Sequence, residues 1–254
     1  MPESLHQKSL APAWRQAPLQ PSILPGELHV WRLDLDRLEG KNESRMGLLS
    51  ADELQRAQRF IFQQHRERFV AARAALRRIL ADYLQTDAAT LRFGYASHGK
   101  PYISLPDNPN NLRFNLSHSG GVALLALAVG IEVGVDIERI QTDFPYLEIA
   151  QQFFTAVEYA ALCATDQALQ CETFFRYWTH KEAFIKATGV GLSLPLQQFV
   201  VSLQPDTPSK LLHAVCPPPD HVLLALSPCA GHVGAVAVMG GYTKLQLWAD
   251  SASD

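Results

Sequence analysis

The feature that most constrains the fold is a pair of short apolar runs in the middle of the chain. Val122–Val129 is apolar throughout, and Val133–Ile137 is nearly so. Gly130 and Glu132 separate the two runs and indicate a reversal of the chain. Because both runs have the length of strands buried within a sheet, we expect them to form a buried antiparallel hairpin. The polar stretch Asn115–Gly121 before them predicts a turn.

Helix starts are indicated by two capping-box patterns. Ser50 with Glu53, and Thr155 with Glu158, have the spacing at which a cap side chain and the third helical residue exchange hydrogen bonds. Apolar residues also recur every three or four positions before Leu84, which predicts a buried helical stripe. We expect helices from Ser50 onward, over residues 66–84, over residues 155–164, and over residues 167–188 with a stop at Gly189.

The remaining strands determine the fold class. Alternating or apolar stretches predict strands over residues 27–35, 199–203, 221–226 and 232–239. Helices and antiparallel strands are therefore mixed without regular βαβ alternation. This pattern favours an α+β fold over a doubly wound parallel sheet.

Charge is distributed unevenly along the chain. Residues 1–130 hold 16 Lys+Arg and 12 Asp+Glu, a net charge of +4, whereas residues 131–254 hold 6 and 13, a net charge of −7. Opposite fields of this kind can form the two walls of one cleft. We therefore divide the chain into a Pro-rich, poorly ordered lead-in (1–25), a basic N-terminal half (26–130) and an acidic C-terminal half (131–254).

Several classes of protein are disfavoured by the composition. No apolar run reaches the roughly 18–20 residues of a membrane-spanning helix, and no signal-peptide pattern is present. The four cysteines form no CxxC pair, which argues against a zinc ribbon or a dithiol redox site. An excess of acidic residues weakens a nucleic-acid interpretation. We expect a cytoplasmic protein without a membrane or nucleic-acid partner.

Asp136 and Glu138 are candidate metal ligands. They lie two residues apart on an expected strand, so both carboxylates share one face. Two adjacent carboxylates repel each other unless a cation lies between them or one takes a proton, and Mg²⁺ accepts one or two carboxylates together with substrate phosphates. The alternative is an exposed strand face with two solvated acids.

Glu182 makes the metal interpretation stronger. It falls on the same helical stripe as Phe175, Trp178 and Ile185, where an unpaired charge is costly. The carboxylate therefore requires a cation or a metal ion. A simple helix salt bridge to Lys186, four residues later, is the alternative.

His118 and Lys100 are candidate anion-binding residues. His118 lies between two serines and precedes two glycines, so hydroxyls, backbone N–H groups and an imidazole could meet an anion there. Lys100 lies in a loop whose direction Pro101 restricts. A turn histidine without a ligand and a solvated loop lysine remain the alternatives.

Taken together, these segments resemble the 4′-phosphopantetheinyl transferase superfamily, in its Sfp-like, single-chain type. The matching stretches follow one another in family order over about residues 45–200. They are Gly99–Pro101, Phe114–Gly120, Gly134–Glu138, Phe153–Thr155 with Glu158, and Trp178–Lys186, followed by Gly189, Gly191 and Leu192.

The resemblance implies two similar α+β halves, each a small antiparallel sheet with a long helix, and a site in the cleft between them. It further implies a monomer that transfers phosphopantetheine from coenzyme A to a serine of an apo acyl or peptidyl carrier protein and releases 3′,5′-ADP. Mg²⁺, or Mn²⁺ in its place, would assist. The carriers would belong to fatty acid, polyketide or nonribosomal peptide assembly.

The resemblance also assigns roles to single residues. Asp136, Glu138 and Glu182 would hold the metal, and Lys186 and Glu182 would orient or deprotonate the acceptor serine. Contacts to coenzyme A would come from Lys100, Pro101, Ser117, His118, Lys186, Arg73 and, more loosely, Arg56. Because some relatives carry a basic residue near Glu53, the grip on the 3′-phosphate is expected to depend mainly on Arg73 and its neighbours.

Two other functions remain open from the residues alone. One is a coenzyme A or nucleotide-binding module without catalysis, which the three intact acids disfavour. The other is a metal-dependent phosphodiesterase that uses the same acids. Both share with the transferase a need for positive charge around phosphates, which the eight arginines between Arg45 and Arg78 could supply.

Overall fold

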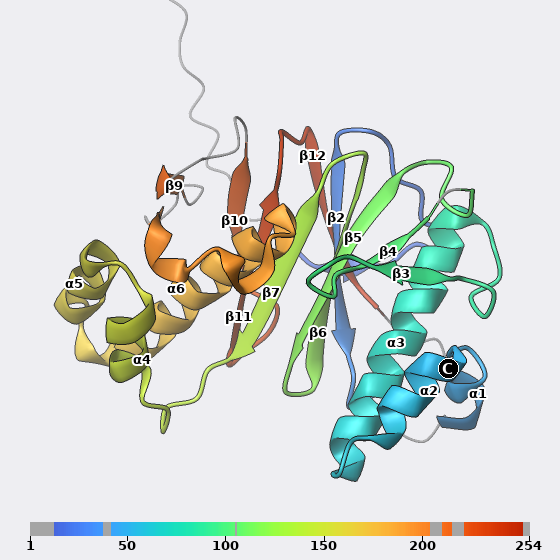
Figure 1. Ribbon diagram of the computed structural model, residues 1–254, viewed down its shortest axis with the longest axis horizontal. Helices are drawn as coiled ribbons and strands as arrows, with labels where there is room; N and C mark the ends of the chain where they lie inside the picture. Colours follow the sequence, from blue (N-terminus) through green and yellow to red (C-terminus); the bar gives the residue numbers. More distant parts are fainter. Residues whose placement is uncertain (1–12, 38–41, 105, 204–209, 215–220, 251–254) are drawn as a thin grey trace, which may run out of the picture.

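The computed structural model of the chain describes residues 13–37, 42–104, 106–203, 210–214 and 221–250. It is a mixed α+β structure in which two small sheets lie side by side and each is covered by a long helix (Figure 1). This confirms the expected fold class.

The N-terminal half begins with a strand, continues through helices and ends with two strands. Its elements are β2 (Glu27–Asp34), α1 (Asn42–Met46), α2 (Ala51–Gln58), α3 (Gln63–Leu84), the small hairpin β3 (Phe93–Tyr95) and β4 (Pro101–Ile103), β5 (Leu112–Ser119) and β6 (Val122–Val129).

The C-terminal half repeats this order. Its elements are β7 (Val133–Arg139), α4 (Tyr146–Phe153), α5 (Ala156–Ala164), α6 (Gln167–Thr188), the 3₁₀ turns η1 (Gly191–Ser193) and η2 (Leu196–Gln198), the pair β8 (Phe199–Ser202) and β9 (Lys210–Ala214), β10 (Val222–Leu226) and β11 (His232–Val238).

The two sheets have the same topology. The first has the strand order β2-β6-β5 and the second has the order β7-β11-β10, so in each the last strand of the half lies in the middle. Each long helix follows the first strand of its half. The two halves are therefore pseudo-symmetric, as the resemblance implied.

Two short strands extend the first sheet and correct the expected boundaries. β12 (Lys244–Ala249) pairs in parallel with β2, and β1 (Arg15–Gln16) pairs with β12. The last strand thus belongs to the sheet of the N-terminal half, across the division that we placed at residue 130. Part of the expected lead-in is likewise ordered into this sheet, while its residues 1–12 lie outside the described residues.

β6 is apolar throughout because both of its faces are buried. Its odd-numbered residues pack under α3 with Trp31 and Leu76. Its even-numbered residues, Leu124 among them, pack between the two sheets with Val135 and Val236. A strand covered on both sides has no polar face, which explains the uninterrupted run. A separate core, centred on Phe174 and Phe184, lies under α6.

The expected central hairpin is wrong. β6 pairs with β5 and β2, whereas β7 pairs with β11 in the other sheet. The hairpin that does form joins β5 to β6, and its turn is at Gly120 and Gly121. The polar residues 115–119 were expected in a turn but belong to β5, because their side chains find partners on β7.

The helix ends were predicted more accurately. Both capping boxes form, at Ser50 with Glu53 and at Thr155 with Glu158. α6 ends as expected before Gly189, whose φ of 71° lies in the left-handed region that glycine adopts without strain. Among the described residues, none of the helices is both long and apolar enough to cross a membrane.

Candidate active site

The site lies where the edge strands β5 and β7 of the two sheets meet. Asn115, Ser117 and Ser119 alternate along β5, so their side chains share one face. Each reaches across to β7 with a hydrogen bond. Their partners are the N–H of Val135, which donates to the amide oxygen at 2.8 Å, and the carboxylates of Asp136 and Glu138, which accept from the hydroxyls at 2.9 and 2.7 Å.

α6 supplies a lysine to this seam. Lys186 Nζ lies 2.5 Å from Asp136 Oδ1 and 3.0 Å from Ser117 Oγ. The helix can approach this closely because β7 has a glycine beneath it: a Cβ at Gly134 would lie only 2.1 Å from the carbonyl oxygen of Ala183. Helix and strand backbones therefore touch, and the lysine reaches the buried carboxylate.

Asp136 keeps one oxygen uncommitted. Its side chain is buried, and within the described part of the chain Oδ2 meets no hydrogen-bond donor. A buried carboxylate oxygen without a partner is costly. It is the kind of oxygen to which a hard cation binds.

Glu138 and Glu182 lie in the same acidic region. Burial raises the pKa of the Glu138 carboxyl, and the negative charges of Asp136 and Glu182 raise it further against the hydrogen bond from Ser119. Burial also raises the pKa of Glu182, as does the charge of Asp136, while Lys186 opposes the change. The charge of Asp136 thus disfavours the ionised forms of both glutamates.

The acids fit a Mg²⁺ ion that takes only some of its ligands from the protein and the others from the substrate. Among the described residues, no three metal-ligating side chains are gathered into a complete metal site. Mg²⁺ commonly takes only one or two carboxylates and completes its octahedron with waters and phosphate oxygens. The free oxygen of Asp136 and the mutually repelling acids fit such an ion.

Basic residues approach from the N-terminal half. The side chain of His118 is exposed in part, but the protein around it desolvates the imidazole and lowers its pKa. The charges of Lys186, Arg56 and Arg68 lower the pKa further. Arg68, from α3, makes a two-pronged contact with Asp36 at 2.6 and 2.7 Å. His118 therefore lies among cations from both halves of the molecule.

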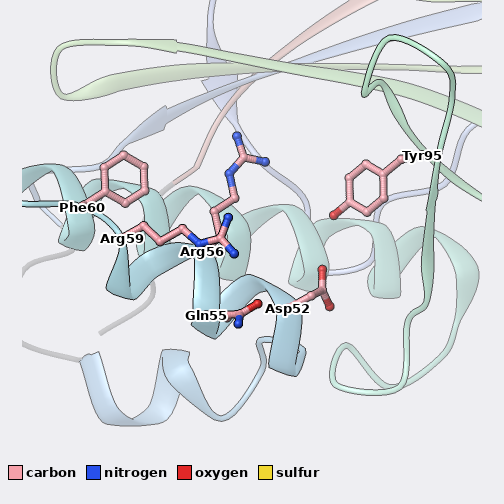
Figure 2. A pocket seen from close by; sticks show the side chains of 6 residues that line it. All are labelled: Asp52, Gln55, Arg56, Arg59, Phe60 and Tyr95. Atoms are coloured by element: carbon pink, nitrogen blue, oxygen red, sulfur yellow. The ribbon is translucent and has the colours of Figure 1, made fainter.

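A cleft of about 570 Å³ opens between α2 and β3 (Figure 2). The Arg56 and Arg59 side chains lie in it between the rings of Phe60 and Tyr95 (Figure 2). Asp52 and Gln55 complete its lining. Two guanidinium groups between aromatic rings suit a ligand with a phosphate and a flat base.

Arg73 is not placed as expected. It lies behind this cleft, 9% exposed, where its Nε donates to Glu53 Oε1 at 2.6 Å. It is absent from the lining of the cleft, as far as the described residues go. Its pairing with Glu53 was not expected, whereas its Nη2 makes no hydrogen bond among the described residues, so a contact from Arg73 to a phosphate stays a prediction.

Lys100 and Pro101 lie on the β3–β4 hairpin. Lys100 Nζ lies 2.8 Å from Glu132 and donates to the carbonyl of Val133 at 2.9 Å. Both residues line a smaller cleft of about 190 Å³ that also contacts Gly189 at the end of α6. The hairpin is thereby tied to the start of the C-terminal half.

Sequence reasoning missed Ser119 and Arg59. Ser119 was quoted in a motif but given no role, although it orients Glu138. The signal was present, because Asn115, Ser117 and Ser119 recur with the period of two that marks one face of a strand. Arg59 carries no signal that separates it from the neighbouring arginines.

Comparisons with known proteins show which family the sequence matches. Residues 39–129 match the model of the N-terminal part of 4′-phosphopantetheinyl transferases, and residues 132–237 match that of the 4′-phosphopantetheinyl transferase superfamily. The 4′-phosphopantetheinyl transferase HetI of Nostoc is 38% identical over 92% of this chain and 97% of its own. The corresponding enzyme Sfp of Bacillus subtilis is 35% identical over 70% of this chain and 78% of its own.

A structural likeness is much fainter. The crystal structure of the holo-[acyl-carrier-protein] synthase of Thermotoga maritima covers 44% of this chain and 64% of its own, with 18% identity and a TM-score of 0.36. This likeness is too slight to support an argument.

Proposed function

Because the chain belongs to the 4′-phosphopantetheinyl transferase superfamily, we propose that the β5–β7 seam is where it transfers phosphopantetheine from coenzyme A to a serine of an apo carrier protein. The observation that carries this proposal is the contact of Ser117, Asp136 and Lys186, with an unpaired oxygen on a buried acid beside a basic cleft. In the reaction the serine oxygen bonds to the phosphorus next to the pantetheine arm. The diphosphate P–O bond breaks, and 3′,5′-ADP leaves.

Glu182 is proposed to accept the proton of the attacking serine. Its pKa is raised by burial, which makes the carboxylate a better proton acceptor than an ordinary glutamate. Lys186 is better suited to orienting the reactants than to accepting a proton, because its ammonium group donates to Ser117 and Asp136. It would hold the diphosphate and balance the charge of Asp136.

The acids would also hold the metal. Asp136, Glu138 and Glu182 are the proposed protein ligands of Mg²⁺ or Mn²⁺, with Ser119 orienting Glu138. Held by these acids, a divalent ion would supply positive charge to the diphosphate oxygens.

Coenzyme A is proposed to span the two clefts. Arg56 and Arg59 would take its 3′-phosphate, because bidentate guanidinium contacts suit phosphate oxygens. His118 and Ser117 would contact the diphosphate near the seam, and Lys100 with Pro101 would contact the coenzyme from the β3–β4 hairpin. Arg73 would support this surface from behind.

The test is transfer to purified apo acyl and peptidyl carrier proteins, with the full chain, coenzyme A and Mg²⁺. Each accepted carrier should gain the mass of one phosphopantetheine on a serine. EDTA should stop the reaction, and excess Mg²⁺ or Mn²⁺ should restore it. Ranking the carriers of fatty acid, polyketide and nonribosomal peptide assembly by transfer rate identifies the preferred acceptor class.

Two outcomes would contradict the proposal. Coenzyme A binding without transfer to any carrier would indicate a non-catalytic binding module. Cleavage of coenzyme A in a control without carrier, at the rate seen with carrier, would indicate a phosphodiesterase.

A further inference from the structure

Three charged side chains are buried directly behind the cleft that Arg56 and Arg59 line, which we call the arginine cleft. Glu53, Arg73 and Arg77 are 2%, 9% and 1% exposed. Glu53 Oε1 accepts from Arg73 Nε and Oε2 accepts from Arg77 Nε, each at 2.6 Å. Glu53 is therefore fully engaged and cannot itself reach a ligand in the cleft.

This cluster connects the elements that form the cleft walls. Glu53 is on α2, three residues before Arg56, which lines the cleft. The two buried guanidinium groups lie over the ring of Phe93, 4.8 and 5.0 Å from its centre. Phe93 begins β3, two residues before Tyr95 on the opposite wall. One carboxylate thus sets where both walls lie relative to α3.

The capping box fixes the carboxylate along its own helix. The N–H and the hydroxyl of Ser50 both donate to Glu53 Oε2 at 3.0 Å. Glu53 is therefore held from the start of α2 and from α3 at once. Removing its charge would leave two buried guanidinium groups without a counter-ion, and it would release the contact that joins the start of α2 to α3.

We propose that Glu53 is a positioning residue that holds Arg56 and Arg59 at the spacing needed for the 3′-phosphate of coenzyme A. It acts through Arg73 and Arg77, without touching the ligand. The inference rests on the proposed function, because it takes the cleft as the site of that phosphate. It goes further by naming what makes the cleft selective.

The other half offers a matched control. Glu158 occupies the same capping-box position on α5, is 1% exposed, and pairs with the buried Lys181 of α6 at 2.8 Å. It does not line the arginine cleft, and it pairs with one buried cation where Glu53 pairs with two. Glu158→Gln should therefore weaken the fold without altering phosphate selectivity.

The experiment compares binding of 3′,5′-ADP with binding of 5′-AMP, which lacks only the 3′-phosphate, by calorimetry on the full-length protein. Wild type should bind 3′,5′-ADP about tenfold more tightly, a preference equivalent to about 1.4 kcal/mol. Glu53→Gln should reduce the preference to about twofold or less, and Glu158→Gln should keep it. A ratio of affinities does not depend on the fraction of folded protein, so a loss of stability alone leaves it unchanged.

Binding does not require turnover, so this test stands apart from the transfer assay. Wild-type selectivity retained in folded Glu53→Gln overturns the inference, as does a wild-type protein that ignores the 3′-phosphate. If Glu53→Gln fails to fold, Glu53→Asp provides the same readout. It keeps the charge but shortens the reach, and its preference for 3′,5′-ADP should be smaller than that of wild type. Unchanged selectivity in folded Glu53→Asp then counts against the inference.

Discussion

The two halves of the molecule use the same buried ion pair to attach a capping helix to a long helix. Arg77 and Lys181 are each the fifteenth residue of their long helix, counted from Gln63 and Gln167. Each pairs with the glutamate of a capping box. Each also donates to two backbone carbonyls beyond the helix, those of Ala88 and Leu91 in the first half and of Leu196 and Phe199 in the second.

The halves differ in the helix positions that follow these cations. In α6 the next residue is Glu182, and Lys186 follows four positions later and reaches Asp136. In α3 the corresponding residues are Arg78 and Asp82, which lie 4.0 Å apart, and Arg78 also pairs with Asp250 at 2.6 Å. The scaffold is therefore duplicated, whereas the proposed catalytic groups occur in one of the two described long helices only.

β12 accounts for part of this difference. It covers the edge of β2, the strand that corresponds to β7. The corresponding edge of β7 faces β5 instead, where side chains make the contacts. One half thus closes this edge with another strand, and the other half builds the candidate site there.

The largest effect should come from the acid at the centre of the seam. Asp136→Ala removes the partner of Lys186 and the proposed metal ligand, and should lower the transfer rate by at least about a thousandfold. Mass spectrometry of a carrier protein measures the rate, and circular dichroism confirms that the variant is folded. Near-normal transfer would show that the site lies elsewhere.

A paired substitution tests the difference between the long helices. Glu182→Gln should slow transfer by about a hundredfold, because it removes the proposed proton acceptor. Arg78→Gln, at the corresponding position of α3, should leave transfer within about twofold of wild type. Equal losses in steady-state assays of the two variants would mean that the halves share the chemistry after all.

The shared ion pairs should contribute similarly to stability. Glu53→Gln leaves Arg73 and Arg77 uncompensated and Glu158→Gln leaves Lys181 uncompensated, and each should lower the free energy of unfolding by at least about 3 kcal/mol. Urea denaturation of both variants measures this. If only one variant is destabilised, the two pairs are not equivalent, however alike their geometry.

The smallest expected effect is on the loss of stability in acid, through a histidine buried in the core of the N-terminal half. Burial lowers the pKa of His29, which lies 2.6 Å from the Tyr83 hydroxyl, although Glu27 opposes the change. The neutral form favoured by folding stabilises the protein above the unfolded pKa of about 6.5, and this contribution is lost as the pH falls below it. Each pKa unit between the folded and the unfolded state changes the free energy of unfolding by up to about 1.4 kcal/mol.

His29→Gln removes this titration. The variant should lose less stability than wild type between pH 7 and pH 5, as measured by urea denaturation at both pH values. Parallel losses in the two proteins would assign the acid sensitivity to other groups.

Local patterns in the sequence predicted α2, α3, α5 and α6 and the common face of two acids, but not the short helices α1 and α4. Both capping boxes, the end of α6 and the shared face of Asp136 and Glu138 depend on neighbours within a few residues. Such interactions are set by backbone geometry and survive in most folds. The expected division by charge puts the arginines of α2 and α3 in one half and the acids of β7 in the other.

Features that depend on distant partners could not be predicted in this way. Polar residues on β5 resembled a turn because their partners are on β7, 19 or 20 positions later. Arg73 was expected at the phosphate because nothing in its own segment reveals the pairing with Glu53, 20 positions earlier. The pairing of β12 with β2 joins residues more than 200 positions apart, beyond the reach of any local pattern.

The place of β12 has a consequence for how the protein forms during its synthesis. The strand that completes the first sheet leaves the ribosome after all the other strands that the structure describes. Until then the edge of β2 is uncovered and Trp248 cannot pack against His29. The strands β2, β6 and β5 can pair earlier, but the sheet of the N-terminal half is completed only after the C-terminal half has been synthesised.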